Sequence, residues 1–286
     1  MTTLPSTLIE SLVRTALAED VGAGDITTEV SVPAELSGTA TIIAKEPCVV
    51  AGLALVEAVF REFAGKTQSL VHDGDVVKNG QRVCEISGPA RAILTGERTA
   101  LNFLQQLSGI ATLTRQFVEI VAGTKAQILD TRKTTPTLRV LEKYAVAAGG
   151  GTNHRMGLFD VAMFKDNHRV ILARLGPTAL AQAVVEVRRR QANIPVVIEA
   201  DTLADVEMAL AAGANHILLD NMSLDELREA VRLVAGRAKL EASGGVRLAT
   251  VRAIAETGVD YISVGALTHS ARAVDFSLEM NNVSDE

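Results

Sequence analysis

The C-terminal half of the chain alternates between short apolar runs and amphipathic segments of helical period. Apolar runs at 196–200, 216–220, 239–245 and 261–266 predict strands, and the segments 204–214, 223–235 and 249–259 between them predict helices. Glu199, Asp220 and Glu241 are spaced 21 residues apart, which is about the minimum length of a strand–helix–strand crossover. Successive crossovers of this kind predict a parallel sheet that curves toward a barrel.

Two further apolar runs, 126–129 and 161–164, precede this series and bring the predicted strands between Gln127 and Gly265 to six or seven. A closed α/β barrel has eight strands, so we expect an incomplete, open α/β barrel. The helix predicted over Ala179–Arg190 ends in three consecutive arginines, which we interpret as a solvated last turn favoured by the helix dipole.

The N-terminal part has a different pattern, with a helix predicted over 7–19 that starts in a capping box of Thr7 and Glu10. A strand follows over 38–50, a helix over 53–63 and a long helical segment over 95–122 that Gly109 is expected to break. Residues 69–94 resemble the β-hammerhead of lipoyl and biotinyl carrier domains. Because Lys78 does not stand at an exposed hairpin tip, we interpret this segment as scaffold.

The fold class predicted from these elements is α/β, an open barrel with an N-terminal α+β sandwich or hammerhead domain. We place the N-terminal domain at residues 1–110, with 270–286 packing back on it, and the barrel at 111–269. Asp25, in the segment after the first helix, is expected to lie in a turn or to cap a helix.

Composition excludes several classes of function. Hydrophobic residues make up 48% and charged residues 22%, as in ordinary globular proteins. A net charge of −6, no Trp and only two Tyr argue against a nucleic-acid partner. Cys48 and Cys84 are predicted to be core residues instead of a disulfide framework. Without a signal-peptide pattern or an apolar run near the ~18 residues of a membrane span, we expect a cytoplasmic protein with no membrane partner.

The segment Lys125–Arg169 has the opposite charge, because it holds eight Lys or Arg against four Asp or Glu. Its net charge of +4 leaves −10 for the remaining residues, and it contains the glycine triplet 149–151. A locally cationic, glycine-containing segment in an acidic protein suggests a site for a small, highly charged anion. The triplet is also typical of the end of a helix.

Charged and small residues follow the predicted strands where each ends, which is where α/β barrels place their chemistry. Arg132 is suited to grip a carboxylate or phosphate bidentately, and Glu199 and Asp220 are hard oxygen ligands for Mg²⁺ or for ribose hydroxyls. Glycine turns near helix starts offer N–H groups to a phosphate. The residues of this predicted rim are Arg132, Lys133, Lys165, Glu199, Asp220, Ser243, Gly244, Gly245 and Gly265, with His154 and Arg155 from a loop.

Simpler interpretations exist for several of these residues. The basic segment also fits a solvated surface, Asp220 fits a helix N-cap, and Gly244-Gly245 fits a plain turn. Glu241 precedes those glycines, and we interpret it as structural. His168 and Asn167 also fit a role in orienting their own loop.

Together the motifs resemble the quinolinate phosphoribosyltransferase family, the carboxylating type of nicotinate-nucleotide pyrophosphorylase. The resemblance covers nearly the whole chain, and DTRKT followed by GGGTNHR is its most specific part. The motifs are GDITTE (24–29), GERTALNFLQQLSGIAT (96–112), DTRKT (130–134), GGGTNHR (149–155), FKDNH (164–168), EADT (199–202), LLDN (218–221), EASGG (241–245) and VGALTHS (264–270).

The resemblance implies transfer of phosphoribosyl from phosphoribosyl pyrophosphate to quinolinate with decarboxylation, in de novo NAD biosynthesis. It implies Mg²⁺ held by Glu199 and Asp220, catalytic roles for Lys133, Glu199 and Asp220, and a homodimer or higher oligomer in which Arg98 reaches the neighbouring subunit's site. The implied substrate-binding residues are Arg98, Thr131, Arg132, Lys133, His154, Arg155, Lys165, Glu199, Asp220, Ser243, Gly244, Gly245, Val264, Gly265 and Ala266.

Three other functions are compatible with parts of the pattern. A paralogous phosphoribosyltransferase-like protein associated with molybdenum transport shares the expected fold. A barrel aldolase would form a Schiff base on Lys133 or Lys165. A carrier module would use the hammerhead, although no lysine stands in the expected position.

Overall fold

The computed structural model describes residues 4–285 and divides the chain into two compact units. One unit comprises Met1–Arg115, Val140–Gly150 and Ser270–Glu286, and the other comprises Gln116–Arg139 and Gly151–His269. The domain boundary predicted at residue 110 falls inside a single helix, α4 (Ala90–Val121), whose residues belong to both units.

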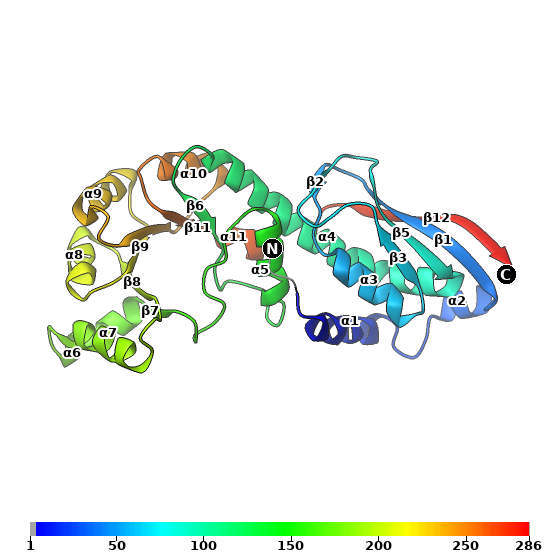
Figure 1. Cartoon of the computed structure of the whole chain (residues 1–286), viewed down its shortest axis with the longest axis horizontal. Coiled ribbons are helices and arrows are strands. Elements are labelled where there is room, and N and C mark those ends of the chain that lie inside the picture. The colour runs from blue at the N-terminus through cyan, green and yellow to red at the C-terminus, as the bar shows by residue number, and fades with distance from the viewer. Residues whose placement is uncertain (1–3, 286) are drawn as a thin grey trace. The chain divides into compact units, whose positions relative to one another are not determined.

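The first unit is built on a four-stranded antiparallel sheet in the order β12–β1–β5–β3 (Figure 1). Strand β12 (Phe276–Asp285) pairs with β1 (Leu36–Ala44) along the full length of β1, so the last strand in the chain forms an edge of the N-terminal sheet. The other strands are β3 (Lys66–Ser69) and β5 (Arg82–Pro89), with a separate pair of β2 (Cys48–Val49) and β4 (Val76–Val77).

The helices of this unit are α1 (Ser6–Asp20), α2 (Ile26–Ser31), α3 (Leu53–Glu62), most of α4 and α5 (Arg139–Ala148). They pack apolar faces into its core, except α2, which buries only Thr28 and leaves Ile26 and Val30 exposed. Helix α5 belongs here and not to the barrel where the predicted domains put it, and Tyr144 on α5 donates to Asp73 Oδ2 at 2.6 Å. The triplet 149–151 follows directly after α5, as expected of a helix end.

Two local predictions in this unit are wrong. Helix α1 begins at Ser6 after Pro5, whose carbonyl accepts from the Leu8 and Ile9 N–H groups, so Thr7 lies inside the helix and cannot cap it. Helix α4 continues through Gly109, where a Cβ would stand 2.0 Å from the Arg272 carbonyl oxygen. Gly109 therefore permits a close backbone approach instead of breaking the helix.

Asp25 caps α2, since its Oδ1 accepts from the Thr28 N–H at 3.0 Å, and its other oxygen accepts from the Thr95 hydroxyl at 3.1 Å. Hydrogen bonds from Thr28 lower the pKa of Asp25. The capping interpretation of this residue is therefore confirmed, and its role lies in the first unit.

The second unit is a six-stranded parallel sheet in the order β6–β11–β10–β9–β8–β7, which confirms the open α/β barrel. The first and last strands of this unit, β6 and β11, pair side by side, and no pairing joins β6 to β7 within residues 4–285. The strands are β6 (Gln127–Leu129), β7 (Ala162–Phe164), β8 (Val196–Ala200), β9 (His216–Asp220), β10 (Lys239–Ser243) and β11 (Tyr261–Ser263).

Helices cover the outer side of this sheet, with α8, α9 and α10 along it in Figure 1. All five residues of β8 are buried, as expected of a parallel strand covered on both faces. The helices are α6 (Asp166–Leu175), α7 (Ala179–Arg190), α8 (Leu203–Ala211), α9 (Leu224–Val234), α10 (Leu248–Ala255) and the short α11 (Ala266–His269).

Among the described residues, no single helix is long and apolar enough to cross a membrane. The pair α6 and α7 reaches that length and apolarity only when combined, and it is bent by 110° at the break.

Candidate active site

A cavity of about 570 Å³ lies at the carboxyl ends of the barrel strands, within the second unit. Parallel strands all present their carboxyl ends at one rim, so residues far apart in sequence converge there. The lining residues are Thr131, Arg132, Lys133, His154, Arg155, Met163, Lys165, Asp166, Glu199, Leu218, Asp220, Glu241, Ser243, Gly244, Gly245, Val246, Arg247, Ser263, Val264, Gly265, Ala266 and His269.

This lining includes every substrate-binding residue predicted from the sequence except Arg98. Arg98 is exposed on α4 in the first unit and does not line the cavity of its own chain. The arginines, lysines, acids and glycine turns predicted to share a rim therefore do share one cavity.

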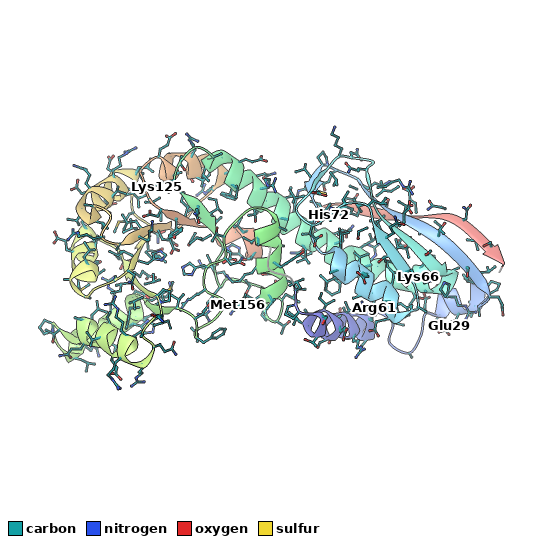
Figure 2. All side chains as sticks on the ribbon, viewed as in Figure 1. Glu29, Arg61, Lys66, His72, Lys125 and Met156 are labelled. Carbon is teal, nitrogen blue, oxygen red and sulfur yellow. The ribbon has the colours of Figure 1, made fainter. Side chains whose placement is uncertain are left out.

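Only four of the eight basic residues in Lys125–Arg169 line the cavity: Arg132, Lys133, Arg155 and Lys165. Lys125 pairs instead with Asp260 at 3.4 Å, outside the lining residues (Figure 2). Four cations of the segment therefore line one cavity, and the other four lie outside its lining.

The loop that carries His154 and Arg155 lies along the free edge of β6. Thr152 donates its N–H to the Ile128 carbonyl at 2.8 Å, and the Asp130 N–H donates to the Thr152 carbonyl at 3.3 Å. The wholly buried Asp130 side chain then accepts from the His154 N–H at 2.8 Å and from Asn153 Nδ2 at 2.7 Å. These bonds fix the loop where the sheet is open, and they direct His154 and Arg155 into the cavity.

Two arginines form the most cationic part of the cavity. Arg132 Nε is buried and has no hydrogen-bond partner within the described part of the chain. Burial, together with repulsion from Arg132, lowers the pKa of Arg155. A cavity that holds two mutually repelling guanidinium groups suits a ligand with more than one negative charge.

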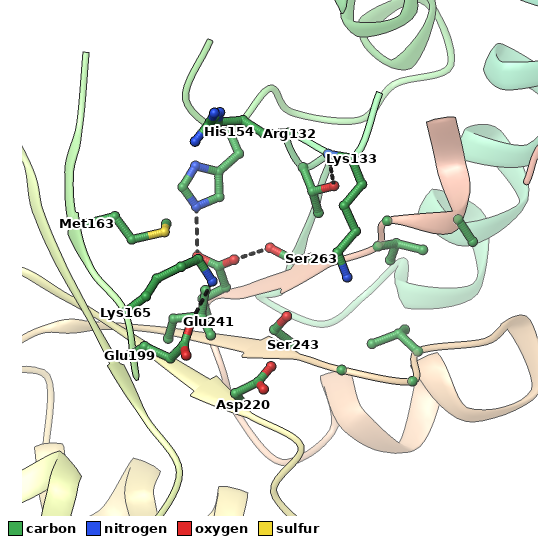
Figure 3. Close-up of a pocket in the computed structure, with 18 of the residues that line it drawn as sticks. Arg132, Lys133, His154, Met163, Lys165, Glu199, Asp220, Glu241, Ser243 and Ser263 are labelled. Atoms are coloured by element: carbon green, nitrogen blue, oxygen red, sulfur yellow. Dashed lines mark hydrogen bonds and ion pairs between the residues drawn. The ribbon is translucent and has the colours of Figure 1, made fainter. Parts of the chain in front are cut away.

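On the acidic side of the cavity, Glu199 forms an ion pair with Lys165. Lys165 Nζ lies 2.6 Å from Glu199 Oε2, and the Asp166 N–H donates to Glu199 Oε1 at 3.3 Å (Figure 3). Burial, with repulsion from Glu199, raises the pKa of Asp220, and nearby Lys165 opposes that shift. A cation bound between Glu199 and Asp220 would relieve this repulsion.

Oxygen atoms of Glu199, Asp201 and Asp220 lie within 4.8 Å of one another. Carboxylate oxygens are the donors that Mg²⁺ prefers, so the residues present fit this ion. Asp220 is not a helix N-cap, because Ser223 caps α9 and accepts from the Glu226 N–H. Its carboxylate lines the cavity and accepts hydrogen bonds from Asn221 Nδ2 at 2.7 Å and from Ser243.

Glycines shape the opposite wall. Gly244 has a φ of +97°, and a Cβ there would stand 2.1 Å from Asn221 Oδ1. A Cβ on Gly265 would stand 3.2 Å from both Lys133 Cδ and His269 Nε2. These close approaches leave backbone N–H groups near the starts of α10 and α11, in a form that can bind a phosphate.

Several lining residues were not predicted to be part of the site: Met163, Asp166, Leu218, Glu241, Val246, Arg247, Ser263 and His269. Strand alternation would have found two of them, since Glu241 precedes Ser243 by two residues and Ser263 precedes Gly265 by two. His269 stands in the VGALTHS motif but had no role assigned. His168 accepts from the Lys165 N–H at 3.1 Å through Nδ1, so it orients its own loop, as one interpretation had it.

The sequence matches two family descriptions that together span most of the chain. Residues 25–108 match "Quinolinate phosphoribosyl transferase, N-terminal domain" and residues 110–279 match "Quinolinate phosphoribosyl transferase, C-terminal domain". A relative from Bacillus subtilis (strain 168), named probable nicotinate-nucleotide pyrophosphorylase [carboxylating], is 42% identical over 95% of this chain and 93% of its own length.

Solved structures are similar over almost their full length. The nicotinate-nucleotide pyrophosphorylase from Francisella tularensis has a TM-score of 0.91 at 38% identity, covering 98% of both chains. NadC from Streptococcus pyogenes has a TM-score of 0.92 at 41% identity, covering 99% of both chains.

Proposed function

The chain belongs to the quinolinate phosphoribosyl transferase family, and we propose that it transfers phosphoribosyl from phosphoribosyl pyrophosphate to quinolinate. The products are nicotinate mononucleotide, pyrophosphate and CO₂, and the reaction serves de novo NAD biosynthesis. The protein is a nicotinate-nucleotide diphosphorylase (carboxylating), and a cytoplasmic location stays a prediction.

One observation carries this proposal: a single cavity is lined by cations, by acids and by glycine turns, each group on its own part of the wall. Quinolinate is a pyridine with two adjacent carboxylates, and Arg132, Arg155 and Lys165 supply the cations that two such groups require. The sugar phosphate needs hydroxyl acceptors and N–H donors, which Asp220 and the turns at Gly244 and Gly265 supply.

The chemistry requires no covalent intermediate with the protein. The pyridine nitrogen forms a bond to ribose C1 while the bond from C1 to the pyrophosphate oxygen breaks, and pyrophosphate leaves with that electron pair. The bond between ring carbon C2 and its carboxylate then breaks, CO₂ leaves, and C2 takes a proton from water. The cationic pyridinium ring holds the electron pair left at C2.

The residues of the cavity contribute by placement and charge. Lys133, with its carbonyl held by the Thr268 hydroxyl at 2.6 Å, directs an ammonium toward negative charge that builds on the leaving group. Glu199 and Asp220 stabilise the positive charge of the oxocarbenium-like sugar. Lys165 forms an ion pair with Glu199, whereas a Schiff-base lysine must be neutral, so this geometry argues against Lys165 as the Schiff-base lysine of an aldolase.

Glu199 and Asp220 are the proposed Mg²⁺ ligands, with the Asp201 carboxylate close to both. When bound, the ion neutralises charge on the pyrophosphate group.

Arg98 completes the site from a second copy of the chain in the proposed homodimer. It is exposed on α4 and distant in sequence from every lining residue of the cavity. Mixing an Arg98→Ala variant with a Lys165→Ala variant should restore about a quarter of the wild-type activity, because random exchange leaves that share of sites intact. If no activity is restored, the proposal that Arg98 acts in the cavity of a second copy of the chain is wrong.

Product analysis tests the proposed reaction. The protein is incubated with phosphoribosyl pyrophosphate, Mg²⁺ and either quinolinate or nicotinate, and nicotinate mononucleotide is measured by chromatography. We expect product from quinolinate and at most a trace from nicotinate, which lacks the second carboxylate. No product from quinolinate would contradict the proposal and would favour the molybdenum-transport paralogue.

A further inference from the structure

Glu241 on β10 is a wholly buried carboxylate at the floor of the cavity, and the proposed reaction gives it no task. Burying a carboxylate is costly unless hydrogen bonds or charges compensate for the water it loses. A carboxylate buried at this cost in the barrel interior indicates that its negative charge has a role in the cavity.

Three elements supply partners to this carboxylate. The Ser263 hydroxyl on β11 donates to Oε1, while His154 Nε2 from the loop lies 3.1 Å from Oε2 (Figure 3). His216 Nε2 on β9 lies 2.8 Å from the same oxygen. Burial alone would raise the pKa of Glu241, but the two histidines outweigh it and lower the pKa, so the carboxylate is charged.

The contacts of His154 fix its tautomer. The Arg155 backbone N–H donates to His154 Nδ1 at 2.6 Å, so Nδ1 is an acceptor and carries no proton. The ring proton is therefore on Nε2 and is donated to Glu241. The ring also stacks on His216, with centroids 6.0 Å apart and planes inclined by 22°. Glu241 thus sets the orientation of His154 and, through the shared peptide, of the Arg155 backbone.

The charge of Glu241 also acts on Arg155. Burial and repulsion from Arg132 lower the pKa of Arg155, whereas the carboxylates of Asp160 and Glu241 raise it. Glu241 is the member of that pair that lines the cavity. It is therefore a fixed countercharge for Arg155, whose guanidinium is repelled by Arg132.

We infer that Glu241 is a positioning residue for the carboxylated pyridine substrate. It holds His154 in the Nε2–H tautomer, and it keeps Arg155 beside Arg132 in the cavity. Ser263 in turn holds Glu241 by a hydrogen bond, and His216 lies against the same carboxylate. This inference rests on the proposed function, because it assigns the two arginines to the carboxylates of that substrate.

Kinetics of a Glu241→Gln variant test it. Glutamine keeps the size of the side chain but removes the charge and turns one acceptor into a donor. We expect KM for quinolinate to rise on the order of tenfold, as for other outer residues that orient a ligand group, and KM for phosphoribosyl pyrophosphate to stay within about twofold. In ¹⁵N spectra of labelled histidine, the His154 Nε2–H signal should shift or exchange. Glu207→Gln, an exposed change on α8, should alter neither KM.

Ser263→Ala keeps the charge and removes one donor, so it provides a second test if Glu241→Gln does not fold. Here KM for quinolinate should rise about fivefold, since a lost hydrogen bond to a positioning group costs on the order of 1 kcal/mol. A folded, active Glu241→Gln or Ser263→Ala protein with unchanged KM for quinolinate would overturn the inference alone. A wild-type protein with no activity would overturn the proposed function as well.

Discussion

Lys165 Nζ lies 2.6 Å from Glu199 Oε2 and joins the basic side of the cavity to its acidic side. The ammonium therefore neutralises the carboxylate that Glu199 would otherwise offer to Mg²⁺. Removing it in a Lys165→Met variant should strengthen Mg²⁺ binding without substrates about thirtyfold, because a unit charge about 4 Å from a divalent ion is worth roughly 2 kcal/mol in water. Activity should fall at the same time.

Isothermal titration with Mg²⁺ alone measures this effect. Lys239→Met is the matched control, because Lys239 pairs with Asp260 at 3.0 Å outside the cavity and its removal should leave Mg²⁺ binding unchanged. Weaker Mg²⁺ binding to Lys165→Met would count against Glu199 as a ligand of the ion.

Arg132→Ala should abolish turnover of quinolinate. The guanidinium is partly buried, and its Nε has no partner among the described residues. Loss of a desolvated charge partner costs roughly 2–5 kcal/mol, so kcat/KM should fall by about 30-fold to 5,000-fold. Steady-state kinetics measure this, with Arg190→Ala as a control at an exposed arginine that pairs with Glu186. Near-normal activity of Arg132→Ala would contradict the assignment of Arg132 to a carboxylate of quinolinate.

Gly109→Ala should destabilise the first unit even though alanine favours helix. The added Cβ would stand 2.0 Å from the Arg272 backbone oxygen, which cannot move without shifting the chain. Gly96→Ala in the same helix meets only Phe60 and Val59 side-chain atoms at 3.1–3.2 Å, so it should cost less. Thermal unfolding of both variants should give the lower Tm for Gly109→Ala, and the reverse order would refute the packing argument.

Glu46 and Arg272 give the first unit a pH-dependent contact. The bidentate bond from Arg272 lowers the pKa of Glu46 in the folded protein below the ordinary 4.5 of a glutamate. Its stabilising effect is therefore complete above about that pH and is lost as the pH falls through the lower, folded-state pKa.

Glu46→Gln should thus lower Tm by about 1–4 °C at pH 7, as for a well-aligned surface pair, and by progressively less as the pH falls below the unfolded value. Thermal scans across this range check the trend, with exposed Glu57→Gln for comparison. A Tm difference that grows toward acid pH would contradict the assignment.

Much of this architecture could be predicted because strand ends in a parallel sheet must converge. The alternation of apolar runs and helices predicts strands that end at Glu199, Asp220 and Ser243, and all three residues line one cavity at the strand ends. The charge of Lys125–Arg169 indicated the site, but sequence distance cannot separate Arg132, which faces the cavity, from Lys125, which pairs with Asp260.

What could not be predicted depends on contacts between distant segments. Gly109 looks like a helix breaker until Arg272 is placed against it, and Glu241 looks structural until two histidines from other elements meet its carboxylate. Helix α5 joined the first unit because of packing, which its own periodicity does not reveal.

The proposed reaction is tested most directly by the ratio of CO₂ to pyrophosphate released. Purified protein is incubated with phosphoribosyl pyrophosphate, Mg²⁺ and quinolinate labelled in its C2 carboxylate, and labelled CO₂ and pyrophosphate are measured together over time. The account predicts that both appear at equal rates and only when both substrates are present. Pyrophosphate release without labelled CO₂, or neither product, would contradict it.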